Sequence, residues 1–538
     1  MSDAIVIGAG VNGLVAANLL VDRGWDVLVL EAQAAPGGAV RTDELTLPGF
    51  RHDTFSSFYP FAAASPIIGG LQLEDHGLRW RRAETVVAHP LRDGRVAAVH
   101  ADVGATAASL EAFAPGDGDR WRALVQRYVG SQRAGVLRTF YSPFPPVRGG
   151  GRLLADLGPM GLMRFSRFAL TTARRMGAEH FDGEGGPLLL AGNALHASLS
   201  PEQLPSGAFG WLMCMLAQTV GFPVVQGGAA GMIEALVRRL RAGGGALRCG
   251  ARVGRIEVAG GRATGVVLDG GERIPARRAV LADVVAPSLY GGLLDERHVP
   301  PTLRADLRHF HLDDATVKVD WALEAPIPWA AQAARRAGTL HVSDGLDGLT
   351  RHGADVLRRH LPAEPGLVVG QYHAVDPTRM PEGTETAWAY THVPHQVTGD
   401  AGGDGLTGRW TDEEAGRFAD RMEAQIEAVA PGFRARIRAR HILTPLGLQA
   451  RDENLLHGAI NAGSASLDQM LVFRPAAWHL GRPETPVADL YLASASAHPG
   501  GGVHGACGAN AARAALLHDR LRPLRRVRVT GLRALSSR

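Results

Sequence analysis

The apolar positions at the start of the chain predict a strand, a turn, a helix and a second strand in close succession. Residues 4–7 are apolar, and the helix that follows carries apolar side chains on one face as far as Asp22. A second apolar run, Val27–Leu30, ends at Glu31. Short apolar runs of this kind are consistent with fully buried strands. The N-terminus is therefore predicted to form a βαβ unit.

A glycine-rich turn links the first strand of this unit to its helix. Gly8 allows a tight turn, Gly10 lets the backbone approach a pyrophosphate, and Gly13 permits close packing of the helix on the strand. The free N–H groups at the start of the helix attract an anion. Glu31, 18 positions after Gly13, would accept hydrogen bonds from a ribose. The unit predicts a dinucleotide cofactor, but by itself it does not distinguish NAD from FAD.

A second glycine-rich segment lies near the other end of the chain. An apolar strand in residues 489–497 runs into His498-Pro-Gly-Gly-Gly-Val-His504-Gly505, and an alanine-rich helix follows. A loop with little side-chain bulk at a helix N-terminus can contact an anionic or electron-rich ring edge. The alternative, a glycine-rich surface turn, fits less well with the strand and helix that bound the segment.

The stretch after Glu31 decides between the two dinucleotides. Pro36–Thr42 contains two adjacent glycines followed by an arginine, and it resembles the extended fingerprint of the flavin-containing amine oxidase and phytoene desaturase superfamily, in which such a turn carries the FAD pyrophosphate. Arg41 stands two positions later than in phytoene desaturases proper. With Pro48–Asp53 and Ser56–Pro60, this spacing resembles the phytoene-dehydrogenase-like clade of the pyridine nucleotide-disulphide oxidoreductase domain protein 2 type and the carotenoid ketolase type.

The resemblance implies an α/β fold with a discontinuous Rossmann-type FAD-binding domain and an interleaved α+β substrate-binding domain. It places the FAD-binding domain in residues 1–105, 216–309 and 441–520, the substrate-binding domain in 106–215 and 310–440, and a basic tail in 521–538. No cysteine stands at the attachment position of covalent relatives, so a non-covalent FAD is expected. The residues that the resemblance assigns to FAD are Gly8, Gly10, Asn12, Gly13, Glu31, Ala32, Gly37, Gly38, Ala39, Val40, Arg41, Val253, Asp283, Ser496, Gly502, Val503, His504 and Gly505.

Composition narrows the class of protein further. The chain has 538 residues, 46% hydrophobic and 20% charged, which fits a globular protein of more than one domain. Three cysteines without a CxxC pair exclude a disulfide framework and a cysteine-rich metal site, and they suit a cytoplasmic location. A net charge of +4 gives no sign of nucleic-acid binding. We expect no metal site, no signal peptide and no transmembrane helix.

Lys318 is the single lysine among 57 Lys and Arg residues. Residues 316–323 alternate as a strand, with Lys318 and Asp320 on one face. The segment resembles the strand that places a lysine near flavin N5 in amine oxidases, where an amine could relay a proton or assist oxygen activation. The alternative is a lysine that snorkels at a strand edge. The residue pattern does not choose between these two interpretations of Lys318.

Several other polar and aromatic side chains could reach the cofactor or the substrate. His504, predicted with Lys318 to be catalytic, and His498 flank the glycine-rich loop, although such histidines often only bind their own loop. The remaining candidates are a strand face with Trp388, Tyr390 and His392, which could line a pocket or form ordinary core, and the pair His52 and Asp53, which could lie near the ring or form a turn.

The resemblance implies dehydrogenation of an apolar small molecule, lipid or polyene by hydride transfer to flavin N5, with oxygen or a quinone-like compound as the electron acceptor. Because Phe, Trp and Tyr make up only 6% of the chain, no extensive aromatic cage is expected. Three alternatives stay open: an amine-oxidase-type oxidase that releases hydrogen peroxide, a flavin-assisted ketolase or isomerase, and a non-catalytic prenyl-lipid binder. Fold resemblance alone cannot choose among substrates.

Two basic segments could touch a membrane surface. Leu153–Met176 is amphipathic, with arginines among its apolar residues, and the tail after Asp519 is rich in arginine without acids. The alternative for the first segment is a set of helices packed on the domain core with solvated arginines. The tail is expected to be a frayed end. The oligomeric state is left open.

Overall fold

Two seven-stranded sheets organise the computed structural model, which describes residues 1–535 and the side chains of residues 1–522. In the first sheet the strand order is β10-β11-β12-β1-β2-β9, and β20 pairs with β12. β1 is parallel to both β2 and β12, whereas β10, β11 and β12 are antiparallel. Its strands are β1 (Ser2–Ile7), β2 (Val27–Leu30), β9 (Ala246–Arg248), β10 (Val253–Ala259), β11 (Arg262–Leu268), β12 (Arg273–Ala282) and β20 (Leu490–Leu492).

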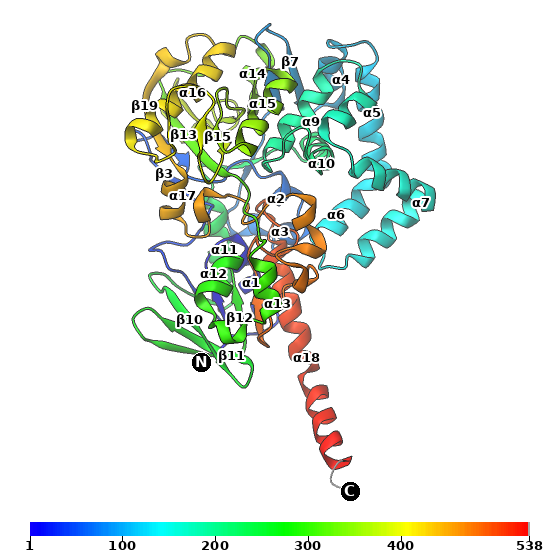
Figure 1. Ribbon diagram of the computed structural model, residues 1–538, viewed down its shortest axis with the longest axis vertical. Coiled ribbons are helices and arrows are strands. Elements are labelled where there is room, and N and C mark those ends of the chain that lie inside the picture. The colour runs from blue at the N-terminus through cyan, green and yellow to red at the C-terminus, as the bar shows by residue number, and fades with distance from the viewer. Residues whose placement is uncertain (536–538) are drawn as a thin grey trace.

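Helices α1 (Val11–Val21), α11 (Ala230–Ala242) and α18 (Ala506–Leu535) lie beside the first sheet (Figure 1). The side-chain amide of Asn18 on α1 donates to the carbonyl oxygen of Leu236 on α11 at 3.1 Å. Where α18 meets α1, a Cβ added to Gly508 would lie 1.9 Å from the carbonyl oxygen of Asn12. Only glycine permits this close approach, so the alanine- and glycine-rich start of α18 is what lets it pack on α1.

The second sheet has the strand order β19-β13-β17-β16-β14-β6-β7. Helix α16 (Asp412–Val429) covers one face, where Trp321 donates its indole N–H to Glu423 at 2.9 Å. The opposite face carries Lys318, Trp388 and Tyr390. The strands are β6 (Thr85–Pro90), β7 (Val96–His100), β13 (Ala315–Leu323), β14 (Ala337–Val342), β16 (Leu367–Gln371), β17 (Glu385–Val393) and β19 (Ile437–Leu443).

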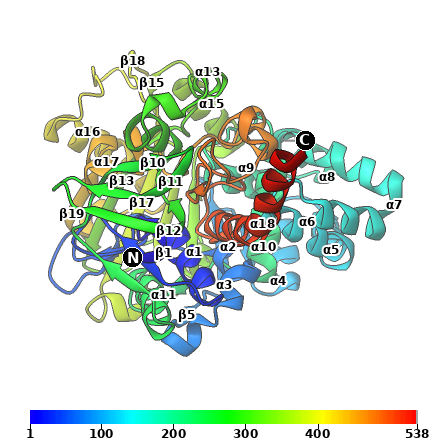
Figure 2. The same cartoon turned by 90° about the horizontal axis from the view of Figure 1, so that it is seen from below.

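A group of helices lies beside the second sheet on one side of the molecule (Figures 1 and 2). These helices are α4 (Val103–Glu111), α5 (Asp117–Arg127), α6 (Arg133–Tyr141), α7 (Val147–Ala169), α8 (Ala173–His180), α9 (Gly185–Leu195) and α10 (Ser206–Thr219).

Short elements complete the described part of the chain. The remaining helices are α2 (Pro60–Ala64), α3 (Pro66–Gly70), α12 (Ala286–Ser288), α13 (Pro301–Leu307), α14 (Gln332–Arg335), α15 (Gly345–Leu357) and α17 (Pro445–Arg451). The remaining strands form three two-stranded pairs: β3 (Thr42–Asp43) with β4 (His52–Asp53), β5 (Trp80–Arg81) with β8 (Val224–Val225), and β15 (His360–Leu361) with β18 (Gly399–Asp400).

The strand pairing refines the predicted domain boundaries. The first sheet draws on residues 2–30, 246–282 and 490–492, three separated stretches that all lie within the segments predicted for the FAD-binding domain. β6 and β7, however, belong to the second sheet, because β6 pairs with β14 in the register Ala337↔Thr85. The predicted segment 1–105 thus contributes strands to both sheets, because a local pattern shows that a strand exists but not which sheet it joins.

The two basic segments that could touch a membrane surface, Leu153–Met176 and the tail after Asp519, are both mainly helical. α7 kinks at Gly158 and exposes Leu154, Met160 and Met163, whereas Phe168 on the same helix packs on Trp211. The tail, expected to fray, continues α18 as far as Leu535, and the side chains from residue 523 and all of residues 536–538 lie outside the described residues. Within the described residues, no helix is both long and apolar enough to cross a membrane.

Candidate active site

The first glycine turn has the geometry that its sequence predicts. Gly8 has a φ of +94°, and a Cβ there would lie 2.8 Å from the carbonyl oxygen of Asp283. A Cβ on Gly13 would lie 2.2 Å from the carbonyl oxygen of Gly8, which explains how α1 comes so close to β1. Gly10 stands at the N-terminus of α1 with extended backbone. The glycines of the turn thus add no side chain of their own at the start of the helix.

Glu31 closes the same turn from the end of β2. Its side chain is buried, and its two carboxylate oxygens accept from the backbone N–H groups of Ala9 and Gln33, both at 2.8 Å. Its carbonyl oxygen accepts from the N–H of Ala251, which brings the start of β10 and Val253 beside it. Glu31 therefore shapes the turn, besides its predicted contact with a ribose. Ala32, the next residue, is exposed.

Asp283 lies directly beneath the first glycine turn, at the end of β12. Its Oδ2 accepts from the N–H of Gly13 at 2.8 Å, and a Cβ on Gly10 would lie 2.9 Å from the same oxygen. Burial raises the pKa of Asp283 to about 7, helped by the charges of Asp452 and Glu31 and opposed by the Gly13 hydrogen bond. Burial likewise raises the pKa of Asp452 to about 6. Sequence reasoning found Asp283 but missed Asp452, which follows α17 far along the chain.

We expect Asp283→Asn to stabilise the flavin-free protein at pH 8 but not at pH 4. An unfolded aspartate titrates near pH 4, and the folded pKa is raised to about 7. The folded wild type therefore loses stability as the pH rises from about 4 to 7, whereas an uncharged Asn avoids this loss. Each pKa unit corresponds to about 1.4 kcal/mol, so the gain is at most about 4 kcal/mol. Urea unfolding of the flavin-free protein at both pH values measures it.

The exposed Asp468, for which no hydrogen bond or ion pair is found in the described part of the chain, offers the matched control for that substitution. Asp468→Asn should change the free energy of unfolding equally little at both pH values. An unchanged free energy for Asp283→Asn at pH 8 would contradict the raised pKa of Asp283.

The second glycine turn abuts the first. The N–H of Gly37 donates to the carbonyl oxygen of Ala9 at 3.0 Å, and a Cβ on Gly38 would lie 3.3 Å from the Cα of Gly10. The N–H of Val40 then closes the turn onto Gly37 at 3.0 Å. Ala39 continues from this turn into the wall of the cavity described below. The structure thus brings the first and second glycine turns together at the N-terminus of α1.

Arg41, predicted to bind the pyrophosphate, lies at the end of the second turn. Its guanidinium is 3.7 Å from the carboxylate of Asp43, and its side chain is 28% exposed. An ion pair this open costs little to break, so the side chain can exchange Asp43 for an anion in the turn.

The C-terminal glycine loop forms another wall. Gly502 and Val503 line the cavity, and Ser496 accepts from the N–H of Ala286 at 3.0 Å and donates to the carbonyl oxygen of Ala462 at 2.9 Å. A Cβ on Gly505 would lie 2.8 Å from Val15 on α1. The loop is therefore held against both the first sheet and α1.

His504 lies behind this loop rather than on its cavity side. Its Nδ1 accepts from the N–H of Ala506 at 3.0 Å and so caps α18, and the edges of the rings of Phe61, Phe140 and Tyr141 surround it. Burial lowers its pKa to about 4. Among the described residues that line the cavity, the loop contributes residues 499–503 but not His504. The geometry favours the loop-binding interpretation of this histidine.

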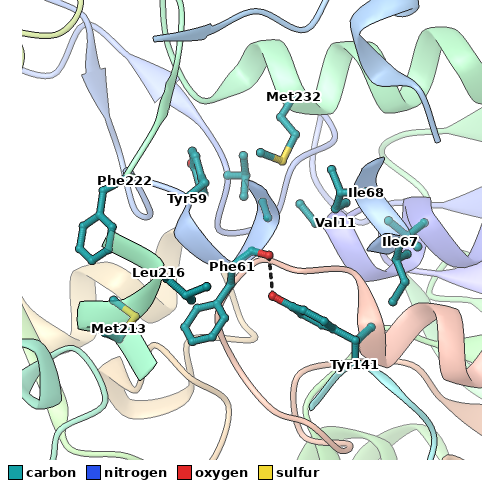
Figure 3. Packing of buried hydrophobic residues seen from close by; sticks show 14 of the residues in the cluster. Val11, Tyr59, Phe61, Ile67, Ile68, Tyr141, Met213, Leu216, Phe222 and Met232 are labelled. Atoms are coloured by element: carbon teal, nitrogen blue, oxygen red, sulfur yellow. Dashed lines mark hydrogen bonds between the residues drawn. The ribbon is translucent and has the colours of Figure 1, made fainter. Parts of the chain in front are cut away.

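A cavity of about 200 Å³ lies between the second sheet, the flanking helices, the second glycine turn at Ala39 and the C-terminal glycine loop. Figure 3 shows Phe61, Met213 and Phe222, which line the cavity, and Tyr141, whose hydroxyl donates to the carbonyl oxygen of Phe61 at 2.9 Å. The aromatic residues that line the cavity are Phe55, Phe58, Tyr59, Phe61, Phe140, Phe209, Phe222, Trp388 and Tyr390.

The expectation that no extensive aromatic lining exists is therefore wrong. Overall composition averages over the chain, whereas these side chains come from elements far apart in sequence and converge on one space. Trp388 and Tyr390 line the cavity, as one of the two interpretations of that strand face predicts. His392 on the same strand turns away and donates to the carbonyl oxygen of Leu195 at 2.9 Å.

Lys318 lines the cavity from the interior strand β13, and its side chain is only 4% exposed. Its ammonium donates to the carbonyl oxygen of Asp53 at 3.1 Å and forms an ion pair with Asp320. The same carboxylate lies 3.5 Å from Nδ1 of His52. Burial alone would raise the pKa of Asp320, but Lys318 and His52 outweigh it and hold the pKa below its usual value. The interpretation of Lys318 as a snorkelling residue at a strand edge is wrong.

A buried ionic cluster next to Lys318 explains why His52 and Asp53 stand out in the sequence. Both are fully buried, and the carboxylate of Asp53 accepts from Arg379 at 2.7 Å and from the hydroxyl of Tyr372 at 3.0 Å. The Arg379 guanidinium also lies 4.1 Å from the centre of the Tyr372 ring. Sequence reasoning missed Arg379 and Tyr372, because neither belongs to a motif. The cluster fixes the peptide whose carbonyl oxygen binds Lys318.

Arg474 is a second buried arginine, and it lines the cavity. All its hydrogen bonds go to main-chain carbonyl oxygens, including those of Ser464 at 2.8 Å and Ala495 at 2.8 Å. Within the described residues, no carboxylate lies within ion-pair distance of its guanidinium. Burial lowers its pKa, but an arginine keeps its charge at ordinary pH. The structure therefore places a positive charge in the cavity wall, where the nearby carboxylate of Asp313 makes no direct ion pair with it.

The chemistry of this site fits a dinucleotide with an attached ring system. The glycine cradle has no room for a Cβ, Gly10 at the helix N-terminus carries no side chain, and the buried amide oxygen of Asn12 has no partner in the described part of the chain. The second turn leads from the cradle at Gly38 directly into the cavity at Ala39. A nucleotide and a hydrophobic ring could thus occupy connected parts of one site.

Comparisons with known proteins agree with this geometry. Residues 12–317, more than half of the chain, match the family model of flavin-containing amine oxidoreductases. The chain is 27% identical over 554 aligned positions to mouse pyridine nucleotide-disulfide oxidoreductase domain-containing protein 2, covering 95% of this chain and 92% of the relative. It is 26% identical to the zeta-carotene-forming phytoene desaturase of Myxococcus xanthus, covering 93% and 90%.

Solved structures share the fold at lower identity. An oxidoreductase from Methanosarcina mazei superposes with a TM-score of 0.61 at 16% identity, covering 95% of this chain and 99% of that one. A putrescine oxidase variant superposes with a TM-score of 0.60 at 17% identity, covering 96% and 99%. These structural matches and the mixed parallel and antiparallel sheets confirm the predicted α/β fold class.

Proposed function

This chain belongs to the family of flavin-containing amine oxidoreductases and is an FAD-dependent oxidoreductase, and from this premise we propose that it dehydrogenates an apolar small molecule or lipid. The observation that carries the proposal is the cavity, in which aromatic side chains surround the single lysine of the chain. Relatives of similar length include phytoene desaturases and a limonene dehydrogenase subunit of Castellaniella defragrans, at 24–26% identity.

In this proposal FAD binds without a covalent link. The two glycine turns, Asn12 and Arg41 would hold its pyrophosphate, and Glu31 would hold its ribose. Cys507 lies under the C-terminal loop, where its thiol donates to carbonyl oxygens and burial raises its pKa to about 12. A thiol with so high a pKa is a poor nucleophile, which supports non-covalent binding. When bound, FAD supplies the hydride acceptor of the reaction.

The chain's own residues would exclude water and handle the proton. The aromatic side chains of the cavity wall would exclude water from the substrate and orient it by contact. The substrate loses a hydride and a proton to form a double bond. Lys318 lines the cavity and can pass this proton on by giving one of its ammonium protons to Asp320 or His52 as its amine takes the proton of the substrate. Oxygen or a quinone-like compound would then accept the electrons.

An absorbance spectrum tests the cofactor, and anaerobic bleaching tests the reaction. Peaks near roughly 375 and 450 nm, with FAD released into the supernatant by heat, are expected of a non-covalent flavoprotein. Apolar lipids should bleach the absorbance near 450 nm under anaerobic conditions. Bleaching by amines alone, with hydrogen peroxide released in air, would favour an amine oxidase instead. A colourless protein that takes up no added FAD would overturn the proposal.

We expect Arg474→Met to lower the reduction potential of the bound flavin by about 30 mV or more. Reduction adds negative charge to the site, and the buried guanidinium, whose hydrogen bonds go to main-chain carbonyl oxygens, stabilises this charge. For a two-electron couple, 30 mV corresponds to about 1.4 kcal/mol. A redox-dye titration of the loaded protein measures the shift. Arg474→Lys keeps the charge and should shift the reduction potential less. Equal reduction potentials in Arg474→Met and wild type would contradict the prediction.

A further inference from the structure

One end of the aromatic cavity is polar. On the cavity-facing side of the second sheet, Thr339 of β14 and Tyr390 of β17 present hydroxyl groups, and His196, just beyond α9, lies across from them. All three line the cavity. The hydroxyl of Tyr390 lies 3.5 Å from Nδ1 of His196. We call these three residues the polar end.

The hydroxyl of Thr339 has no partner. The residue is fully buried, and its Oγ1 makes no hydrogen bond to any described residue. Leaving a buried hydroxyl unpaired is unfavourable, and the residue that carries this hydroxyl lines the cavity. An unpaired group in that position is suited to a polar atom that arrives with the ligand.

His196 and its neighbour His341 keep the polar end neutral. Nε2 of His196 lies 2.8 Å from Nε2 of His341, so one ring donates and the other accepts, and adding a proton to the accepting nitrogen would break the bond. Burial lowers the pKa of His196 to about 3. No described Asp or Glu lines the cavity. The polar end thus offers neither an anion for an ammonium group nor a cation for a carboxylate.

The polar end is well separated from Lys318. Thr339 pairs with Gly370 of β16, Gly370 pairs with Trp388 of β17, and β17 pairs with β13, which carries Lys318. Three strand spacings separate β14 from β13, which corresponds to about 14 Å across the sheet. A ligand that reaches both ends has an extended apolar body between them.

We infer that the substrate carries one neutral oxygen, a hydroxyl or a carbonyl, which the polar end binds while the apolar body extends past the aromatic wall toward Lys318. This inference rests on the proposed function, because it names the class of substrate for the same site. A pure hydrocarbon would leave Thr339 unpaired, and an alkylammonium or a carboxylate would be desolvated at the polar end without a counter-charge.

Binding of three eight-carbon probes to the FAD-loaded protein tests the inference. Calorimetric titration should show 1-octanol binding at least tenfold more tightly than n-octane or octylammonium. Thr339→Val, which has nearly the same shape without the hydroxyl, should reduce the preference for octanol over octane at least fivefold and leave the affinity for octane unchanged. Tyr390→Phe should also lower the affinity for octanol more than the affinity for octane.

Thr386 provides the matched control on the same strand as Tyr390. It is also fully buried with an unpaired hydroxyl in the described structure, but it does not line the cavity. Thr386→Val should keep the full preference for octanol. The inference is overturned if octane or a charged probe binds wild type as well as octanol does, if no probe binds, or if Thr339→Val keeps the preference.

Flavin content and anaerobic bleaching, recorded on the same preparations, separate the two levels of the argument. Failure of the proposed function appears as a protein without FAD or without bleaching by any apolar compound. Failure of the inference alone appears as normal flavin content and bleaching by a hydrocarbon as fast as by its alcohol.

Discussion

Gly10→Glu should abolish flavin binding in this protein while leaving the chain folded. Gly10 has an extended backbone that any residue can adopt, so backbone strain is not the reason. A Cβ at this position would lie 2.9 Å from the carboxylate oxygen of Asp283, and the longer side chain would fill the approach to the helix N-terminus. Its negative charge would also repel a pyrophosphate.

We expect the affinity for FAD to fall on the order of 100-fold or more, which equals about 2.7 kcal/mol. The measurement is the absorbance near 450 nm per protein after reconstitution with FAD, together with circular dichroism to monitor folding. Gly69→Glu is the control, because Gly69 is exposed on α3 and its Cβ would meet nothing within 4 Å. Full flavin content in Gly10→Glu would show that the nucleotide does not bind at this turn.

The nucleotide turn could be predicted from sequence because its parts lie close together in the chain. Gly8, Gly10 and Gly13 act through backbone geometry over a few residues, and Glu31 follows at a fixed spacing with its carboxylate on the same turn, so a local pattern carries that information. Asp452, in contrast, joins the same site through a fold that no local pattern describes. Its carboxylate lies near Gly38 only because α17 packs there.

The cavity could be predicted only in part, for the same reason. The alternation around Lys318 places its side chain on the correct face of a strand, but it does not show that β13 lies inside a sheet between β19 and β17. The aromatic wall and the polar end are built from α2, α6, α10, β14, β17 and the residue after α9 together. Such sites depend on long-range pairing, so composition and periodicity do not locate them.

Lys318→Met should slow the anaerobic bleaching of bound flavin by a lipid substrate about 10²–10⁴-fold, the usual range for a positioned proton-transfer group. It should also lower the free energy of unfolding by about 3–5 kcal/mol, because Asp320 would stay buried without its partner. Stopped-flow absorbance and urea unfolding measure the two effects. The loss of stability alone would not establish a role in the reaction, so the two effects must be separated.

The double variant Lys318→Met/Asp320→Leu separates them. It removes the stranded carboxylate together with the ammonium, and replacing a whole buried ion pair by apolar side chains is often neutral for stability. We therefore expect the free energy of unfolding to recover toward that of wild type while bleaching stays as slow as in Lys318→Met. Recovery of both would make Lys318 a structural residue. Reoxidation by oxygen, followed after photoreduction, shows in the same variants whether the ammonium acts on the acceptor as well: if Lys318→Met reoxidises as fast as wild type, its role is confined to the step that involves the substrate.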